Sequence, residues 1–231
     1  MLFIQHELQR TAQNLVADNI KNGEHVLVVS SSDQSKELID AIVTAASSTG
    51  AASVSAIIIA CPENLRDYKH PPAVIASVES ADLTIVATSL RFPRAYDDLS
   101  EALFKAGKRQ VLINNAPLED FTRGASLADP IKLNRRTHAL AAKISKGKTV
   151  RVTSGNGTDL SVKVCRPCIA LTGRAEVDTG FGSFPSGEAM LSPEERTAEG
   201  IFVADSFGQV VYLNGSGPQL GSLEDPISLE F

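Results

Sequence analysis

Residues 25–60 read HVLVVSSSDQSKELIDAIVTAASSTGAASVSAIIIA and alternate two kinds of apolar pattern. HVLVVS and ASVSAIIIA are short, nearly continuous apolar runs, which are typical of strands buried on both faces of a sheet. The segment SKELIDAIVTAASSTG between them repeats its apolar residues at helical spacing and ends at Gly50, a common kind of helix cap. This stretch therefore predicts a βαβ unit, in which two parallel strands are joined by a helix.

The same alternation extends to both sides of this unit. Helices are expected over residues 8–20, 71–81, 96–107 and 129–146, and further strands over residues 82–89 and 109–115. Four apolar strands separated by helices predict an α/β fold with a parallel sheet flanked by helices on both faces.

From Lys148 onward the apolar pattern changes to period two. Residues 150–164 alternate around the turn SGNGTD, whose Asn-Gly pair favours a β-hairpin. Short strands are expected at EGIFVADS, QVVYLNG and PISLEF. The sequence thus predicts two domains, residues 1–147 with the parallel sheet and residues 148–231, which are smaller and mostly β (α+β).

The composition is that of a globular protein, with 43% hydrophobic and 21% charged residues. The longest apolar run, residues 52–61, has about half the roughly 20 residues that span a bilayer. The first ten residues, MLFIQHELQR, lack the pattern of a secretory signal. Three cysteines form an odd count that fits a reducing compartment. We therefore expect a cytoplasmic protein with no membrane partner.

The net charge of −5 argues against a nucleic-acid partner. Basic residues do gather in and after the helix over residues 129–146, but no aromatic residues interleave them, which favours a solvated face. They are Lys132, Arg135, Arg136, Lys143, Lys146 and Lys148.

For several polar motifs we favour a structural role over a catalytic one. The turn SSSDQSKE has no glycine through which a pyrophosphate could approach the backbone, so a helix cap at Ser32 or Asp33 is favoured over nucleotide binding. Cys165 and Cys168 have the spacing of a redox pair or half a zinc site, but they follow a hairpin, which favours two inert buried thiols. The histidines show no helical i, i+4 pair, which favours surface or strand-end positions; they are His6, His25, His70 and His138.

Residues 184–195, FPSGEAMLSPEE, hold three carboxylates. The SPEE segment fits a helix capping box with Ser192 as the cap and Glu195 three residues later. Glu188 follows the Pro-Ser-Gly turn at the start of a strand, where it is either a metal ligand or an exposed strand-end acid. Asp178, in EVDTGFGS, is a weaker candidate ligand, with an Asx-type turn as the alternative.

Three stretches together resemble the metal-dependent aminopeptidases of the aminopeptidase T and aminopeptidase S family. They are VRVTSGNGTDLSV, the P-x-G-E turn from Pro185 to Glu188, and AEGIFVADS from Ala198 to Ser206. The resemblance implies that Glu188 is a metal ligand. It also implies two divalent metals, zinc, cobalt or manganese, and release of N-terminal residues such as leucine from peptides by metal-activated water.

This sequence departs from that family in its length. Family members are longer, and their other ligands, a second glutamate, histidines and a His-x-Asp pair, come from a C-terminal portion that we do not find here. One glutamate cannot hold two metals, so we expect weak metal binding and impaired or absent activity. Two alternatives stay open: a non-catalytic binding or assembly module, and a relative of the ring-cleaving 2,5-dihydroxypyridine dioxygenases, which use one iron centre.

The expected partners are a peptide or small-molecule substrate and a second copy of the chain. The last segment, PISLEF, alternates apolar residues up to Phe231, and an unpaired strand edge of that kind recruits other strands. We therefore expect a homo-oligomer.

Overall fold

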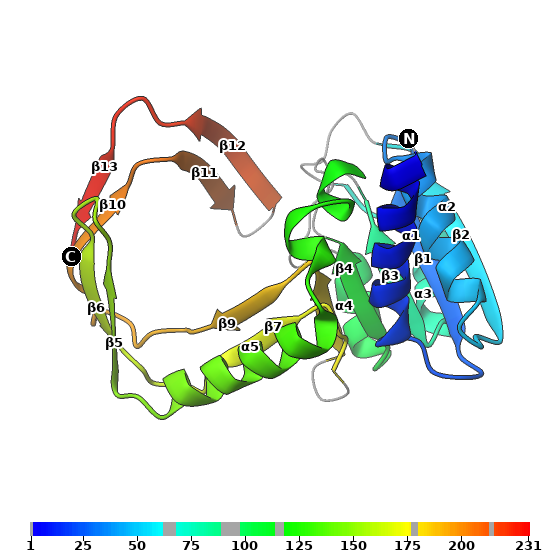
Figure 1. The fold of residues 1–231 in the computed structure, drawn as a ribbon, viewed down its shortest axis with the longest axis horizontal. Coiled ribbons are helices and arrows are strands. Elements are labelled where there is room, and N and C mark those ends of the chain that lie inside the picture. The colour runs from blue at the N-terminus through cyan, green and yellow to red at the C-terminus, as the bar shows by residue number, and fades with distance from the viewer. Residues whose placement is uncertain (1, 62–67, 89–97, 114–117, 177–179, 213–214) are drawn as a thin grey trace. The chain divides into compact units, whose positions relative to one another are not determined.

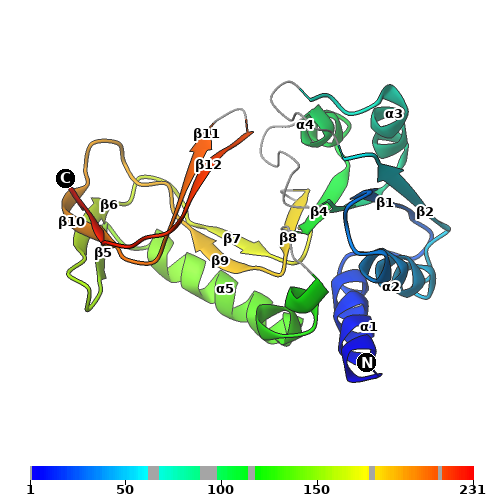
Figure 2. The same ribbon diagram turned by 90° about the horizontal axis from the view of Figure 1, so that it is seen from above.

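The structure is a computed structural model that describes residues 2–61, 68–88, 98–113, 118–176, 180–212 and 215–231 (Figures 1 and 2). By its internal contacts the chain divides into two compact units. Unit 1 comprises Met1–Asn134 and Leu171–Gly187, and unit 2 comprises Arg135–Ala170 and Glu188–Phe231. The expected division into residues 1–147 and 148–231 stays a prediction.

A five-stranded parallel sheet forms the centre of unit 1, which confirms the α/β fold class. Its strands are β1 (His25–Ser31), β2 (Ser53–Ile59), β3 (Leu83–Ala87), β4 (Arg109–Ile113) and β8 (Phe181–Phe184). They lie in the order β2-β1-β3-β4-β8, and every neighbouring pair is parallel. The sequence predicts the first four strands but not β8, which pairs with β4 from beyond the expected domain boundary.

Helices cover both faces of this sheet, as expected for strands with apolar residues on each side. They are α1 (Leu2–Ala17), α2 (Lys36–Ser47), α3 (Pro72–Ser80) and α4 (Asp98–Lys105). Val26 and Val28 of β1 pack in a core with α1 and α2, whereas Leu27 and Val29 pack with α3 and α4. Figure 2 shows the two helix pairs on opposite sides of the sheet.

Two features of these helices differ from the sequence prediction. The cap of α2 is Ser35, whose Oγ accepts the Leu38 N–H at 3.2 Å, rather than Ser32 or Asp33. Ser32 instead accepts the Cys61 N–H at 3.0 Å. The first helix begins at Leu2, ahead of the expected start at Leu8.

The link between the sheet and the β-rich part contains two short 3₁₀ helices and a long α-helix. They are η1 (Leu118–Phe121), η2 (Gly124–Leu127) and α5 (Pro130–Ser145). The basic residues that the sequence places in and after α5 are all exposed, in agreement with a solvated face. Every helix in the described ranges is too short or too polar to cross a bilayer.

The remaining strands form antiparallel and two-stranded pairings, which confirms a smaller, mostly β region. A four-stranded sheet has the order β13-β10-β6-β5, from β5 (Thr149–Thr153), β6 (Asp159–Lys163), β10 (Glu199–Ala204) and β13 (Ile227–Glu230). β5 and β6 form the expected hairpin. Two further pairs are β11 (Phe207–Tyr212) with β12 (Gly215–Ser222), and β7 (Ile169–Thr172) with β9 (Gly187–Met190).

The capping box expected at SPEE is wrong, because no helix follows Ser192. Pro193 instead forms an isolated antiparallel bridge with Val164, and the Glu194 N–H donates to Lys163 O at 3.0 Å. The backbone groups that a capped helix would have used are therefore occupied by pairing with a distant strand.

Candidate functional site

Glu188, the first candidate ligand, is the second residue of β9 and is exposed. The bend before it is closely held. The Phe184–Pro185 peptide bond is cis, and the buried Ser186 donates its hydroxyl to Leu171 O at 3.3 Å. A Cβ at Gly187 would lie 2.5 Å from a Leu133 methyl group, so a larger residue there would have to displace the Leu133 side chain. The structure thus places Glu188 at the start of a strand after a fixed bend, and its role as a ligand stays a prediction. Asp178, the second candidate, lies outside the described residues.

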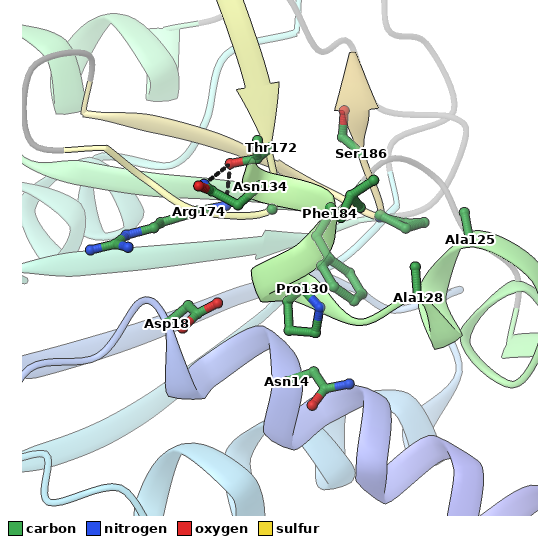
Figure 3. Close-up of a pocket in the computed structure, with 13 residues that line it drawn as sticks. Asn14, Asp18, Ala125, Ala128, Pro130, Asn134, Thr172, Arg174, Phe184 and Ser186 are labelled. Atoms are coloured by element: carbon green, nitrogen blue, oxygen red, sulfur yellow. Dashed lines mark hydrogen bonds between the residues drawn. The ribbon is translucent and has the colours of Figure 1, made fainter. Parts of the chain in front are cut away.

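A small pocket lies in unit 1 beside this bend, with a volume of about 30 Å³ (Figure 3). That space suffices for only a few water molecules. Its polar lining comes from four separate segments and comprises Asn14, Asp18, Asn134, Thr172, Arg174 and Ser186. The ring of Phe184, together with alanine, proline, leucine and glycine residues, supplies the apolar remainder.

Hydrogen bonds connect the polar residues on one side of this pocket. The Asn134 side-chain amide donates to Thr172 Oγ1 at 3.4 Å and to Glu176 Oε1 at 3.3 Å. Thr172 Oγ1 also accepts the Arg174 N–H at 3.3 Å. Figure 3 shows the Arg174 guanidinium extending away from Phe184 and Pro130, and it lies 3.9 Å from Glu176 Oε2. The pocket can therefore hold small polar groups, with one cation and its acidic neighbour at the rim.

The segment that lines this pocket is held against the end of α1 by Asn19, and two glycines in and after it allow close packing. Asn19 is buried and donates to Gly173 O at 2.8 Å, while its Oδ1 accepts the Ala175 N–H at 2.8 Å. A Cβ at Gly182 would lie 2.6 Å from the Arg174 backbone, and one at Gly173 would lie 2.8 Å from the Phe184 ring. The contact at Gly182 is with backbone, so the approach there requires glycine, whereas a Cβ at Gly173 would have to displace the Phe184 ring.

The sequence prediction missed the polar lining of the pocket. The one available signal was Asn134, because asparagine is unfavourable inside a helix unless its side chain has a partner there. Its partners, Thr172 and Glu176, lie 38 and 42 residues away, and nothing in the sequence joins them to it.

A second polar cluster joins His70 to Asp98 in unit 1. His70 Nδ1 lies 2.7 Å from Asp98 Oδ1, and the His70 N–H donates to Asp98 Oδ2 at 2.9 Å. Burial alone would raise the pKa of Asp98, but these hydrogen bonds outweigh it and hold that pKa below its ordinary value. The Tyr68 ring contacts the His70 imidazole edge-on, with 5.1 Å between the ring centroids. Burial and the nearby Asp98 carboxylate raise the pKa of Tyr68.

The expectation of surface or strand-end histidines is wrong for His70, which is buried. It holds for His6, His25 and His138, which are exposed. The Nδ1 atom of His25 lies 2.8 Å from Ser53 Oγ. The four histidines lie on separate segments of the chain, and among the residues with described positions no three His, Cys, Asp or Glu side chains gather as a metal site.

The two cysteines of the C-x-x-C motif are free thiols in different surroundings. Cys168 is buried, as expected, and its N–H donates to Ser145 Oγ at 2.8 Å. The expectation of a buried thiol is wrong for Cys165, which is exposed and whose Sγ donates to Ser192 O at 3.7 Å. The bridge between Val164 and Pro193 holds the chain beside Cys165 at the edge of the hairpin.

Comparison with protein families gives a match over most of the chain. The model of the family described as NicX, 2,5-dihydroxypyridine 5,6-dioxygenase, matches residues 7–213. No curated protein matches the chain.

Among solved structures, the fold is similar to wild-type AmpT from Thermus thermophilus, with a TM-score of 0.56 and 15% identity. The match covers 87% of this chain and 65% of that chain, so the chain spans about two thirds of the AmpT length at most. Alanine–glyoxylate aminotransferase from Nostoc sp. is similar over 49% of this chain and 34% of its own, at 14% identity and a TM-score of 0.32, which is too low to indicate a shared fold. The AmpT likeness supports the expected resemblance at the level of fold.

Proposed function

The chain belongs to the 2,5-dihydroxypyridine 5,6-dioxygenase family, and we propose that it serves in an enzyme that opens a dihydroxylated pyridine ring with molecular oxygen. The observation that carries this proposal is the extent of the family match, which runs through both compact units. A 5,6-dioxygenase breaks the bond between two ring carbons and places both oxygen atoms of O₂ in the product. The reaction therefore needs no further reductant, and one O₂ is consumed for each ring opened.

Iron is the metal that the dioxygenase relationship implies, and the described residues do not by themselves fit an iron centre. Non-haem iron sites of oxygenases combine histidines with a carboxylate around one metal. Here no such group of three gathers among the described side chains, and the four histidines come from α1, β1, the segment before α3, and α5. We therefore assign no catalytic step to this chain, and the proposal requires ligands from outside the described residues.

Within this proposal Glu188 supplies one ligand to the metal. It is supported by the exposure of its carboxylate and by the bend, fixed through Ser186 and Gly187, that determines where β9 begins. Glu194 is also exposed and lies six residues later in an irregular segment, which makes it a matched control. Loss of a true ligand should weaken metal binding by at least the roughly 10–100-fold typical of losing a residue that only hydrogen-bonds to a ligand.

The experiment has two parts. Fe(II) binding is measured by calorimetry without oxygen, and O₂ consumption by the iron-loaded chain is then measured in air with 2,5-dihydroxypyridine as substrate. Expected results are iron-dependent loss of substrate with one O₂ per ring, and weaker iron binding in Glu188→Gln but not in Glu194→Gln. If no iron-dependent uptake is found for the folded chain, the dioxygenase proposal fails for this polypeptide. If both variants bind iron as the wild type does, the assignment of Glu188 fails.

The second candidate function is a metal-dependent aminopeptidase, favoured by the fold likeness to AmpT and by the Pro-Ser-Gly-Glu turn. The same preparation tested with a leucyl anilide and zinc, cobalt or manganese separates the two enzymes. Hydrolysis that depends on one of these metals, without oxygen uptake, favours the peptidase. A folded chain inactive in both assays favours a non-catalytic binding module.

A further inference from the structure

Strand β2 has the composition of a buried strand but lies at the open edge of the parallel sheet. Its seven residues, SVSAIII, include no charged residue and no proline. It is the outermost strand of the order β2-β1-β3-β4-β8, as Figures 1 and 2 show. Ser55 and Ala56 are exposed, and Ile58 is 55% exposed. The strand therefore leaves apolar side chains and one edge of its backbone in water.

The backbone of β2 pairs with β1 on one side. The Ser32 N–H donates to Ile59 O at 2.8 Å, and alternate residues of a parallel strand bond to the same neighbour. Ile59 and every second residue before it therefore bond to β1, whereas Ala56 and Ile58 direct their N–H and C=O groups to the open edge. The register with β1 runs through seven residue pairs without a bulge. Edge strands are usually protected by charges, proline, a bulge or a covering segment, and in the described part of the chain β2 has none of these.

A groove with a volume of about 400 Å³ lies beside β2 on the side of α3. This volume is within the range of sites that bind small ligands. The walls of the groove include Ser53, Ser55 and Ile57 of β2 and Ser77 and Ser80 of α3. Because the side chains of a strand alternate between the two faces of a sheet, every second side chain of a strand added to β2 would point to the side of this groove.

Serine oxygens give this groove the character of a hydrogen-bond acceptor. Ser77 Oγ donates to Ala73 O at 2.7 Å and Ser80 Oγ donates to Ser77 O at 2.9 Å, so both hydroxyl hydrogens are used within α3. Each oxygen keeps lone pairs that can accept a hydrogen bond. Both serines lie in the last turn of α3, where the helix carbonyls carry partial negative charge and no basic residue offsets it. The groove therefore favours a cationic donor, and the net charge of −5 attracts one to the chain.

We propose that the open edge of β2 accepts an extended segment of another protein as an additional strand, with a lysine or arginine side chain of that segment in the groove. In this mode of recognition main-chain hydrogen bonds to the edge give affinity, and the alternate side chains give specificity. A second copy of β2 does not supply the cation, because SVSAIII contains no basic residue. The inference is independent of the proposed ring opening, since it involves neither the metal nor the substrate of that reaction.

A labelled peptide of seven residues, the length of β2, provides the probe. It alternates lysine or threonine with valine, so that its lysines lie on one face when it is extended. Fluorescence anisotropy with the full chain should show saturable binding, and glutamate in place of the lysines should weaken this binding at least about tenfold. Two further peptides carry N-methyl groups on alternate residues, offset from each other by one position. Only one of them should lose binding, because only one set of N–H groups faces β2.

Ile58→Lys and its control Ile131→Lys add the same charge at exposed apolar positions. Ile58 lies on the open edge, whereas Ile131 lies on α5 and is 74% exposed. Ile58→Lys should weaken binding of the lysine peptide at least about tenfold, because a lysine on an edge strand opposes the addition of another strand. Ile131→Lys should leave this binding unchanged. Ala56→Pro removes one N–H from the open edge without breaking a bond to β1, and it should also weaken binding.

The two N-methylated peptides, measured with the wild type, keep the test decisive if a β2 variant misfolds. Equal binding of these two peptides would overturn the proposal, as would equal effects of Ile58→Lys and Ile131→Lys. It is also overturned if the lysine peptide shows no saturable binding up to a protein concentration of about 1 mM. A dimer that Ile58→Lys dissociates, found without peptide binding, would assign the edge to a second copy of the chain instead.

Discussion

The Ala175 N–H donates to Asn19 Oδ1 at 2.8 Å, which joins two residues 156 positions apart in the sequence. Asn19 follows α1, and Ala175 belongs to the segment that lines the pocket and leads into β8. The same side chain donates to Gly173 O and to Leu15 O. One asparagine therefore satisfies three backbone groups, two of them in buried bonds, and fixes the returning segment to the first helix.

We expect Asn19→Ala to lower the free energy of unfolding by about 2–3 kcal/mol. Each buried backbone group left without a partner costs about 1–3 kcal/mol, and water that hydrogen-bonds to these groups in the variant offsets part of that cost. Asn14→Ala is the control, since Asn14 is half-buried on α1, five residues before Asn19, and lines the pocket. It should cost less than about 1 kcal/mol. Urea denaturation followed by circular dichroism measures both, and equal losses would contradict the anchoring role of Asn19.

Gly182 gives a second test of how β8 reaches the sheet. An added Cβ would lie 2.6 Å from the Arg174 backbone, which is closer than such atoms approach, so Gly182→Ala must displace β8 or the segment beside it. Overpacking of this kind costs about 1–3 kcal/mol. Gly155→Ala has open space around the new Cβ and an ordinary backbone angle, and should leave the melting temperature nearly unchanged. Similar melting temperatures for the two variants would show that the close approach relaxes freely.

The sequence predicts the parallel sheet well where the strands are buried on both faces. β1 and β3 are short, nearly continuous apolar runs, and both are buried along their length, as expected for strands covered on both faces. The prediction of a buried strand is wrong for β2, which lies at the edge of the sheet and is mostly exposed. The sequence does not predict β8, because FGSF has four residues and needs Gly182 for a close contact rather than a bulky apolar side chain. The SPEE segment fails for a related reason, since a bridge to Val164 replaces the local cap.

The ion pair between Arg109 and Glu24 tests whether a mostly buried ion pair stabilises the fold more than an exposed one. Arg109 Nη2 lies 2.5 and 2.6 Å from the Glu24 oxygens, and the two side chains are only 12% and 16% exposed. Removing one partner leaves a poorly hydrated charge, so Glu24→Ala should cost about 2–4 kcal/mol. Lys36 and Asp40 also pair at 2.6 Å but are mostly exposed, so Asp40→Ala should not change the urea midpoint measurably. Equal midpoint shifts would show that burial does not strengthen the Arg109–Glu24 pair.

The candidate site could be predicted from the sequence only in its local part. The Pro-Ser-Gly bend and a strand containing Glu188 follow from neighbouring residues, and the structure has both, with the strand beginning one residue earlier, at Gly187. The cluster of Asn134, Thr172 and Glu176 depends on contacts between distant segments, as does the pairing of His70 with Asp98 across 28 residues. No local pattern marks either pair.

The two thiols of the C-x-x-C motif should differ in reactivity. Cys165 is exposed, whereas Cys168 is buried and its backbone is bonded to Ser145. A thiol reagent should label Cys165 within minutes and Cys168 only after unfolding, because a buried thiol is not accessible to it. Mass spectrometry of peptides from Cys165→Ser and Cys168→Ser separates the two sites. Equal labelling rates in the native protein would contradict the difference in burial.

The pairing of Asp98 with His70 predicts a pH dependence of stability. The pKa of Asp98 lies below its ordinary value in the folded chain, because the His70 hydrogen bonds outweigh the effect of burial. A lowered carboxyl pKa means that the ionised form stabilises the fold, and this contribution is complete above the unfolded value of about 3.9 and is lost as the pH falls through the lowered folded value. The free energy of unfolding should therefore be higher for the wild type than for Asp98→Asn at pH 5. The difference should shrink steadily from about pH 4 downward, as urea titrations at half-unit intervals would measure. A difference that stays constant down to pH 2, or grows there, would show that the carboxylate of Asp98 does not stabilise the fold in its ionised form.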